Sequence, residues 1–446
     1  MVGATGTPHK ADASGLPIKD RLTGLGTLAS LRDSIDSIAA ERAADPAPFT
    51  IGLVNLDGFK PINDLFGPES GDDILCQVAE RLLACVPDGA SVMRTGGDEF
   101  AIVLPFVFER KSAEKVGMML KEVLSAPFDI GDRHVRLSAS SGFAIYPFAG
   151  AEAGELTKSA ATALYRSKRR GRAQITVYSH EIAQEMRRAT HMEQALRNAI
   201  IANEIDVHFQ PIVEIATGDI VGFEALARWC DADLGYVSPA VFVPLAEERG
   251  FIDALSEALL RKAAEQAVSW PRHIFLSFNL SSAQLVDPAT ALNVLSIVNR
   301  AGLDPRRLDI EITETAVMAD PDIAGRVLTM LRNVGCRISL DDFGTGQSSL
   351  GRLCDFTFDK VKIDRSFVSR LTAERSTEHI VRAIIDMCHG MNFQVVAEGI
   401  ETAAEVDMLR RLGCTIGQGW YFGKAVDAVT ARRLINDSAT RQLAVG

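Results

Sequence analysis

The hydrophobic residues of this chain recur at two different spacings, which predict strands alternating with helices. Short apolar runs at residues 49–56 and 100–104 have the length and composition of buried strands. Between these runs, one predicted helical face gathers Ile74, Leu75, Val78, Ala79, Leu82 and Leu83. We therefore expect residues 19–178 to form a domain of α/β or α+β architecture.

The second half of the chain shows a different rhythm. Residues 179–203 carry many charges and contain neither Pro nor Gly, so we expect a rigid helical connector. Beyond it, apolar strand candidates recur with helical stretches between them, at residues 207–213, 219–226, 274–280, 308–312, 337–341, 359–363, 393–397 and 415–420. Eight strand candidates within residues 204–437 predict a (β/α)₈ barrel.

The composition is that of an ordinary globular protein with two or three domains. The chain has 446 residues, of which 47% are hydrophobic and 24% are charged. It contains no run of about 18 apolar residues, and its first residues lack the apolar core of a signal peptide. We expect a cytoplasmic protein with no membrane segment and with a tail at residues 1–18.

The net charge argues against one class of partner. A formal charge of -11 and a pI near 5.3 disfavour binding to long nucleic acids, which requires a basic face. A small phosphate ligand held by metal ions is compatible with this charge. One basic cluster, at residues 168–172, follows a helical stretch, and such clusters are usually solvated helix ends.

The cysteine and histidine patterns argue against zinc. The seven cysteines are scattered and form no C-x-x-C pair, and the eight histidines form no H-E-x-x-H or H-x-x-x-H pattern. We expect the cysteines to be small core residues. Any metal must then be held by oxygen ligands, which favours Mg²⁺ or Mn²⁺.

An apolar run at residues 338–340 leads into two adjacent carboxylates, Asp341 and Asp342, and then into a loop with glycines. Successive strand side chains point to opposite faces, so both carboxylates can serve one site only where the strand ends and the backbone turns. Such a pair suits two divalent cations, one carboxylate bridging them and the other completing one shell. An isolated Asp-Asp before a glycine turn is more often a structural loop cap. The metal-binding interpretation therefore depends on whether other predicted strands also end in polar residues.

Polar side chains occur near the ends of six successive strand candidates. They are Glu224, Asn279, Glu311, Asp341, Lys362 and Glu398. A barrel keeps its chemistry at the carboxyl ends of its strands, and a buried acidic group is costly unless it is paired or binds a metal. The set therefore predicts an all-oxygen site for two cations with one lysine beside it.

The ordered motifs resemble two known families. Residues 210–213, 224–226, 341–346 and 398–401 are similar to motifs of the EAL family of cyclic-di-GMP phosphodiesterases. Residues 94–100, Arg-Thr-Gly-Gly-Asp-Glu-Phe, resemble the GGDEF, or diguanylate cyclase, family. The resemblance implies an α+β, nucleotide-cyclase-like GGDEF domain at residues 19–178, joined by the helix at 179–203 to an EAL barrel at 204–437.

The EAL resemblance implies a hydrolase that cleaves cyclic-di-GMP to linear pGpG with two Mg²⁺ or Mn²⁺ ions, and a homodimer formed through the barrel. It implies one ion held by Glu224, Asn279, Glu311 and Asp341, and a second held by Asp341, Asp342 and Glu398. It implies catalytic roles for Lys362, Glu398 and Gln418, substrate contacts from Gln210, Arg228, Asp364 and Gln418, and a loop anchor in Glu314. One nearby departure, Ala227 in place of the usual leucine, should matter little.

The GGDEF resemblance implies a GTP site. It assigns guanine contacts to Asn63 and Asp72, phosphate contacts to Lys168 and Arg172, a metal carboxylate to Asp98, and close approach of the backbone to the nucleotide at Gly96 and Gly97. These matches outweigh the interpretation of residues 168–172 as an ordinary helix end.

The same half departs from the family pattern at positions that cyclisation needs. Asn55 stands where a second metal carboxylate is usual, and an amide oxygen brings no negative charge to hold cations beside a triphosphate. Further departures are Gly26-Thr27 for Asn-Arg, Pro68 for His, Ala161 for Asp, and residues 87–90 for the R-x-x-D of the product-inhibition site. We expect a domain that binds GTP, cyclises it poorly or not at all, and regulates the EAL domain through the connector.

Two other functions stay open on the sequence alone, a bifunctional cyclase and phosphodiesterase and a non-catalytic cyclic-di-GMP receptor. The complete acidic set with Lys362 and Gln418 favours a hydrolase, because a pure binding module would be expected to have lost one of these residues. The alternative to regulation by GTP is a vestigial GGDEF domain kept for solubility or dimerisation.

Overall fold

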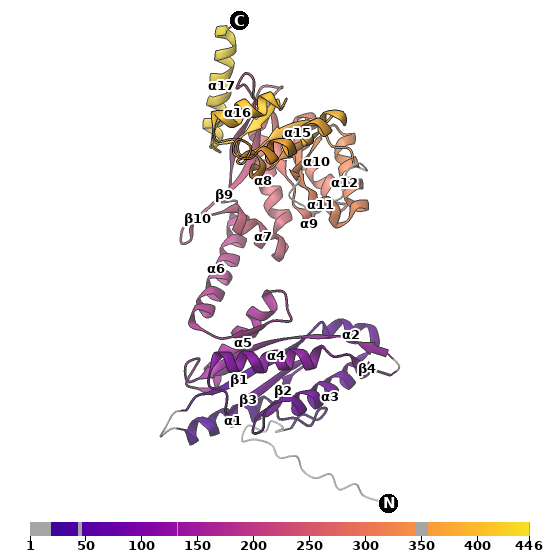
Figure 1. The fold of residues 1–446 in the computed structure, drawn as a ribbon, viewed down its shortest axis with the longest axis vertical. Coiled ribbons are helices and arrows are strands. Elements are labelled where there is room, and N and C mark those ends of the chain that lie inside the picture. The colour runs from indigo at the N-terminus through magenta and orange to yellow at the C-terminus, as the bar shows by residue number, and fades with distance from the viewer. Residues whose placement is uncertain (1–18, 43–46, 132, 344–355, 446) are drawn as a thin grey trace, which may run out of the picture. The chain divides into compact units, whose positions relative to one another are not determined.

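The computed structural model divides the chain into two compact units, Met1–His191 and Met192–Gly446. It describes residues 19–42, 47–131, 133–343 and 356–445. Helix α6 (His180–Ala202) crosses the boundary between the units (Figure 1). The segment expected to be a helical connector is thus a single helix.

The first unit is built on a five-stranded sheet in the order β2–β3–β1–β6–β7. The central strand β1 is antiparallel to both of its neighbours, and β7 lies parallel to β6. The strands are β1 (Phe49–Asp57), β2 (Ser91–Gly96), β3 (Glu99–Leu104), β6 (Ser138–Tyr146) and β7 (Ile175–Val177), with a separate hairpin of β4 (Phe128–Ile130) and β5 (Arg133–Val135). Both strands predicted in this half are present.

Helices cover both faces of this sheet, because alternate side chains of β1 enter two different apolar clusters. Val54 and Leu56 pack with residues of α3 and α4, whereas Ile51 and Leu53 pack with residues of α1 and α5. The helices are α1 (Leu28–Glu41), α2 (Phe59–Phe66), α3 (Pro68–Cys85), α4 (Arg110–Ser125) and α5 (Ala153–Arg169). The predicted face of α3 is buried except for Leu83, which is exposed.

The second unit is a closed barrel. Its strands follow the order β10–β9–β11–β12–β13–β14–β15–β16–β8, and β8 also pairs with β9. They are β8 (Asp206–Glu214), β9 (Ile220–Asp231), β10 (Gly235–Val237), β11 (Phe275–Asn279), β12 (Leu308–Thr313), β13 (Arg337–Phe343), β14 (Lys360–Ile363), β15 (Gln394–Ala397) and β16 (Ile416–Gln418). All eight predicted strands are present, so the predicted barrel class is confirmed.

Helices surround the barrel, as Figure 1 shows for α8, α10, α12 and α15. They are α7 (Pro239–Arg249), α8 (Ile252–Ala267), α9 (Ser282–Leu285), α10 (Thr290–Ala301), the 3₁₀ turn η1 (Pro305–Arg307), α11 (Glu314–Ala319), α12 (Pro321–Asn333), α14 (Arg365–Val368), α15 (Arg375–Gly390), α16 (Ala403–Arg411) and α17 (Ala428–Val445). Within the described ranges, no helix has the length and apolar character that crossing a membrane requires.

The barrel differs from a regular (β/α)₈ barrel at its first strand. β8 is antiparallel to both β9 and β16, and only residues 215–219 connect it to β9. A connection of five residues makes a hairpin, whereas a parallel crossover needs a dozen or more. The expectation of a helix after every strand is therefore wrong for the first pair.

Side chains inside the barrel form layers, because every second residue of a strand faces the interior. A small apolar cluster inside it consists of Ile212, Phe275, Val396 and Ile416. Two residues further along their strands come Ser277, Glu398 and Gln418, while the reversed strand β8 presents Gln210 two residues before Ile212. The apolar cluster thus forms the floor on which the polar layer stands.

Candidate active site

Lys362 is the centre of the polar layer. This lysine is 2% exposed, and its ammonium Nζ lies 2.7 Å from Glu311 Oε2, 2.5 Å from Glu398 Oε1 and 3.6 Å from Asp341 Oδ1. The three carboxylates come from β12, from the turn after β15 and from β13. The structure therefore brings together, around one ammonium group, acids that lie up to 87 residues apart in the sequence.

Two amides hold the carboxylate of Glu224 on β9. Asn279 Nδ2 donates to Glu224 Oε1 at 2.7 Å, and Gln418 Nε2 donates to Glu224 Oε2 at 2.6 Å. Ser277, which the sequence did not single out, donates its hydroxyl to Glu311 Oε1 at 2.5 Å. Both carboxylate oxygens of Glu224 and both of Glu311 thus accept a hydrogen bond, as the cost of burying charge requires.

The Asp341-Asp342 pair sits at an irregularity of β13, which continues through it. The register between β13 and β14 shifts between Leu340 and Phe343, and Asp342 has a left-handed φ of 56°. A bulge of this kind changes the direction of a side chain that regular alternation would point to the opposite face. The backbone turn expected for these two carboxylates is therefore present, although Phe343 still pairs with Ile363.

A second charged layer lies one step deeper in the barrel. Lys360 Nζ is 2.5 Å from Asp309 Oδ2 and 3.4 Å from the centre of the Phe275 ring. Ser339 donates its hydroxyl to Asp309 Oδ1 at 2.7 Å. Since both charges are buried and paired with each other, this layer is neutral by itself.

The upper layer, in contrast, carries an excess of acid, and the pKa values reflect it. Burial, and then the neighbouring carboxylates, raise the pKa of Glu311 well above its usual range and that of Glu398 to about 8. Burial alone would lower the pKa of Lys362, but the surrounding carboxylates raise it well above its usual value. Burial would likewise raise the pKa of Glu224, yet Lys362 and the two amides hold it below its usual value.

The donor chemistry of this layer fits divalent cations. Five carboxylates, those of Glu224, Glu311, Asp341, Asp342 and Glu398, surround or adjoin one ammonium group. When all are ionised, four negative charges remain uncompensated, which two divalent cations would balance. The amide oxygen of Gln418 is also buried without a hydrogen-bond partner in the described part of the chain.

The side chains are nevertheless arranged around the lysine. Among the described residues, no three Asp, Glu, His or Cys side chains stand ready around one ion position. Ions that bind here would have to compete with the ion pairs that Lys362 makes to Glu311 and Glu398.

A cavity of about 300 Å³ opens over the polar layer. Its lining contains Gln210, Glu224, Leu226, Asn279, Asp341, Arg365, Glu398, Gly399, Glu401, Gln418, Gly419 and Trp420. Six of these are predicted site residues. Leu226, Arg365, Glu401 and Trp420 were missed, and the position of Trp420 directly after Gln418-Gly419 is the one signal that could have found it.

Six predicted residues of the barrel are not among the residues that line this cavity. Glu311, Asp342 and Lys362 belong to the polar layer described above, and the other three are Arg228, Asp364 and Glu314. Arg228, four residues beyond Glu224 on β9, donates to the carbonyl oxygen of Ala227 at 2.8 Å. Asp364 accepts from the Ser366 backbone N–H at 2.9 Å, and its charge helps raise the pKa of Asp342 after burial and Asp341. Glu314 is buried at the start of α11, and most of the loop it was expected to anchor lies outside the described residues.

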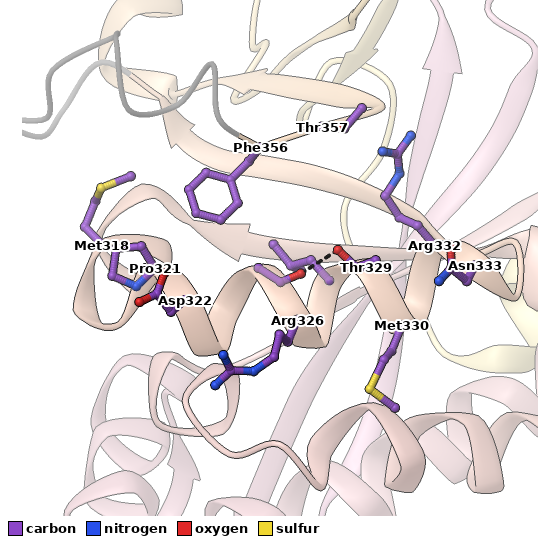
Figure 2. A pocket seen from close by; sticks show the side chains of 12 residues that line it. Met318, Pro321, Asp322, Arg326, Thr329, Met330, Arg332, Asn333, Phe356 and Thr357 are labelled. Atoms are coloured by element: carbon purple, nitrogen blue, oxygen red, sulfur yellow. Dashed lines mark hydrogen bonds between the residues drawn. The ribbon is translucent and has the colours of Figure 1, made fainter.

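A larger cavity lies elsewhere on the barrel, and none of the described residues that line it is a predicted site residue. Its volume is about 1100 Å³, and it runs along α12. Figure 2 shows Phe356 and Thr357 on the side of this cavity opposite α12, which contributes Arg326 and Thr329. Among the residues that the structure describes, the two cavities have no lining residue in common.

In the first unit, Asn55 and Asp57 lie on one face of β1 and form hydrogen bonds with segments that carry predicted GTP-site residues. Asn55 donates from Nδ2 to Asp98 Oδ1 at 3.0 Å. Asp57 accepts from the Ser138 and Ser140 hydroxyls and from the Ala173 backbone N–H at 2.9 Å each. Because Ala173 directly follows Arg172, β1 brings the glycine hairpin and the basic turn to the same end of the sheet.

The remaining predicted GTP residues lie on nearby elements. Gly96 ends β2 and Gly97 begins the turn to β3, and their φ values are positive at 152° and 52°. Asn63 on α2 has a buried Oδ1 with no partner in the described residues, and a Cβ at Gly71 would lie only 1.9 Å from that oxygen. Asp72 is exposed on α3, and Lys168 lies in the last turn of α5.

Comparison with known proteins gives two family matches. A model described as EAL domain matches residues 193–425, and one described as diguanylate cyclase, GGDEF domain, matches residues 18–174. The bifunctional diguanylate cyclase/cyclic di-GMP phosphodiesterase MucR of Pseudomonas aeruginosa is 34% identical over 417 residues, which are 93% of this chain and 61% of MucR. The cyclic di-GMP phosphodiesterase PdeR of Escherichia coli is 31% identical over 417 residues, which are 93% of this chain and 62% of PdeR.

A solved structure agrees with these matches. The PaMucR phosphodiesterase in complex with c-di-GMP is similar with a TM-score of 0.52 and 34% identity, covering 54% of this chain and 99% of that chain. The present chain spans between about half and three fifths of the length of the relatives it matches.

Proposed function

The chain belongs to the EAL domain family and carries a GGDEF domain before its EAL domain, and on this basis we propose that it hydrolyses cyclic-di-GMP to linear pGpG in a metal-dependent reaction. Relatives with the same two domains are named cyclic di-GMP phosphodiesterase or bifunctional cyclase and phosphodiesterase. The main observation in support of this proposal is the acidic layer around Lys362, which lies beneath an open cavity.

The excess of acid is what points to metal-dependent chemistry. A neutral layer such as Asp309–Lys360 needs no further cation, whereas the layer above it lacks four positive charges when fully ionised. In this proposal, Glu224, Asn279, Glu311 and Asp341 would hold one ion, and Asp341, Asp342 and Glu398 would hold the other. Two such ions would stabilise negative charge on a phosphodiester as it is attacked and would favour ionisation of the attacking water.

The chain's own residues then have distinct roles. Lys362 is the one ammonium among the carboxylates, and we assign it to orienting the attacking water and to balancing charge near the phosphate. Gln418 keeps the carboxylate of Glu224 in place through its amide N–H, while its free oxygen can accept a hydrogen bond from water or substrate. Gln210 lies in the wall of the cavity, where it can contact the nucleotide.

The test is turnover of cyclic-di-GMP by the full chain with Mg²⁺ or Mn²⁺, followed by chromatography of the product. Glu224→Ala removes a proposed ion ligand and the acceptor of both amides, so we expect kcat to fall by about 10³-fold or more. Glu214→Ala is the matched control. Glu214 is also a carboxylate on a barrel strand, but it is exposed at the end of β8 that lies away from the polar layer. An unimpaired Glu224→Ala enzyme would refute the assignment.

For the GGDEF domain we propose binding of GTP that regulates hydrolysis, with little or no cyclisation. The support is the convergence of the glycine hairpin and the basic turn at the end of β1, together with the loss of one acid at Asn55. A regulator must bind the two states of the enzyme with different affinity, and the substrate must then tighten GTP binding by the same factor.

Hydrolysis measured with and without GTP tests this part. We expect saturating GTP to change kcat/KM by about fivefold or more. Lys168→Ala should abolish the GTP effect, whereas Arg170→Ala, an exposed arginine of the same basic cluster with no predicted role, should retain it. Identical kinetics with and without GTP would leave the GGDEF domain as a vestigial or assembly module.

Two alternatives make different predictions. A bifunctional enzyme, the description of MucR, would form cyclic-di-GMP from GTP when Glu224 is replaced. A non-catalytic receptor would bind cyclic-di-GMP without metal-dependent turnover. Formation of a homodimer through the barrel also stays a prediction, which sedimentation analysis can check.

A further inference from the structure

The basic turn after α5 has an unusual backbone. Three successive residues, Gly171, Arg172 and Ala173, have positive φ values of 101°, 59° and 49°. Glycine adopts such a conformation freely, whereas in Arg172 and Ala173 the Cβ atom makes it unfavourable. A strained turn of this kind persists only where contacts outside it hold it in place.

Asp57, at the end of β1, provides one such contact. Its Oδ2 accepts the Ala173 backbone N–H at 2.9 Å. The Ser138 hydroxyl donates to the same oxygen and the Ser140 hydroxyl donates to Oδ1, both at 2.9 Å. The two serines thus fix the carboxyl group that receives the Ala173 N–H. Because β1 is the central strand of the sheet, the strained turn is tied to a part of the unit with little freedom.

The beginning of the basic segment has an anchor of its own. Ser167 is fully buried, and its hydroxyl bonds the Ser141 carbonyl oxygen and the Thr176 hydroxyl, each at 2.8 Å. Lys168 directly follows this anchor, and Arg172 directly precedes the one at Ala173. The backbone of the segment that carries both predicted phosphate contacts is therefore held at its two ends. Fixing it in advance lowers the cost of ordering it when an anion binds.

We propose that Asp57 is a positioning residue for the triphosphate of GTP. By accepting the Ala173 N–H it keeps the basic turn in its strained conformation, in which Lys168 and Arg172 can contact the phosphates. This inference rests on the proposed binding of GTP by the GGDEF domain. It adds that Asp57 acts through the turn and not by touching the nucleotide.

The sign of the effect separates this role from simple electrostatics. A carboxylate near a triphosphate repels it, so charge alone would make GTP bind more tightly when Asp57 is removed. Positioning requires the opposite result for Asp57→Ala. Asp57→Asn removes the charge but keeps an oxygen that can accept the Ala173 N–H and an amide N–H that can donate to a serine hydroxyl. The asparagine variant should therefore retain the turn.

Equilibrium dialysis of the full chain with GTP and Mg²⁺ tests the inference. Asp57→Ala should weaken GTP binding by about 10-fold or more, because fewer molecules hold the competent turn. The affinity for guanosine, which lacks phosphate, should change by less than about twofold. Asp57→Asn should bind GTP within about threefold of wild type or more tightly. Asp129→Ala, which removes an exposed carboxylate from the hairpin of β4 and β5, is the matched control and should bind normally.

Normal GTP binding by Asp57→Ala would overturn the inference, and so would an equal loss in Asp57→Asn or an equal loss of guanosine affinity. A second substitution tests the role of strain. Ala173→Gly, which removes the Cβ, should restore part of the GTP affinity when combined with Asp57→Ala. A double variant as weak as Asp57→Ala would contradict the proposed mechanism.

Limited trypsin digestion without nucleotide distinguishes failure of this inference from failure of GTP binding. Arg170 and Arg172 are exposed, so a loosened turn should be cut faster in Asp57→Ala than in wild type or Asp57→Asn. Faster cleavage, with no GTP binding even by wild type, would refute the proposed GTP function while supporting the anchoring of the turn. GTP binding by wild type, with unchanged cleavage of Asp57→Ala, would refute the positioning role alone.

Discussion

Both units place acidic residues where strands end, but the charge of these residues is balanced differently in the two units. In the barrel, the carboxyl groups of the polar layer outnumber the single ammonium group of Lys362, so the layer carries excess negative charge when these groups are ionised. In the GGDEF unit, the remaining acid Asp98 already accepts a hydrogen bond from the amide of Asn55. An acidic site that keeps its excess charge can attract cations, whereas one that satisfies its acids internally has less need of them.

The comparison also separates two uses of charge within the barrel itself. The Asp309–Lys360 pair and the layer around Lys362 are both buried and lie on the same strands two residues apart. The deeper pair is balanced and belongs to the architecture, while the upper layer is unbalanced and faces a cavity. Buried charge alone therefore does not mark a candidate site, whereas unbalanced buried charge beside a cavity does.

The largest expected effect comes from removing the ammonium group of the barrel. Lys362→Met should lower kcat for cyclic-di-GMP by about 10²- to 10⁴-fold, the range typical of a group that assists proton transfer. Thermal unfolding in Mg²⁺ serves as the folding control, and the variant should remain folded there because divalent cations can take over part of the charge balance. Activity within threefold of wild type would show that Lys362 has only a structural role.

The deeper layer should behave as architecture. Asp309→Leu alone leaves Lys360 buried without its partner, so the free energy of unfolding of the barrel should drop by about 3–5 kcal/mol. The double variant Asp309→Leu/Lys360→Met replaces the pair by apolar groups and should recover most of that loss. Denaturant titration measures both, and equal stability of the single and double variants would contradict the idea of a self-contained pair.

Asn55→Asp converts the satisfied pair of the GGDEF unit into one that resembles the barrel. Two carboxylates would then face each other at the place where Asn55 Nδ2 now lies 3.0 Å from Asp98 Oδ1. In EDTA we expect the free energy of unfolding to fall by about 1–3 kcal/mol, because a hydrogen bond becomes a repulsion. Mg²⁺ should restore the loss in the variant but have little effect on wild type, and a loss that Mg²⁺ does not reverse would contradict this interpretation.

The smallest effect concerns pH in the absence of metal. Burial raises the pKa of Glu398 from its usual value of 4.5 to about 8, so the folded barrel holds a proton that the unfolded chain has released between these values. The unfolded state binds fewer protons in this window, and stability must therefore decrease as pH rises from about 5 to 8. The Tm of the barrel in EDTA should fall by a few degrees over this range, and Mg²⁺ should reduce the slope. A Tm that rises with pH would contradict the assignment.

The apolar pattern predicted the elements of the fold well, because a buried strand requires a short run of apolar residues that is visible in the local sequence. All eight barrel strands and the helix at α6 lie where alternation and composition placed them. The sequence pattern did not predict the reversed direction of β8, because apolar spacing does not encode strand direction. The short connection at residues 215–219 was the available clue, because it cannot hold a crossover helix.

The candidate site was predictable to the extent that its residues occupy strand ends. Glu224, Glu311 and Lys362 converge as expected because parallel strands bring their carboxyl ends to one rim. Contacts set by tertiary packing were not predictable, such as the exposure of Trp420 and the turn of the Asn55 amide toward Asp98. Asp57 was missed for the same reason, because its role lies in a contact to Ala173, 116 residues away.

The most direct test of the central claim is a two-substrate assay on the purified full chain with Mg²⁺. In one reaction cyclic-di-GMP is the only nucleotide, in the other GTP is, and products are separated by chromatography. The account predicts pGpG from the first reaction, abolished by Glu224→Ala, and no accumulation of cyclic-di-GMP in the second, even in that variant. Efficient formation of cyclic-di-GMP from GTP, with no pGpG from cyclic-di-GMP, would contradict it.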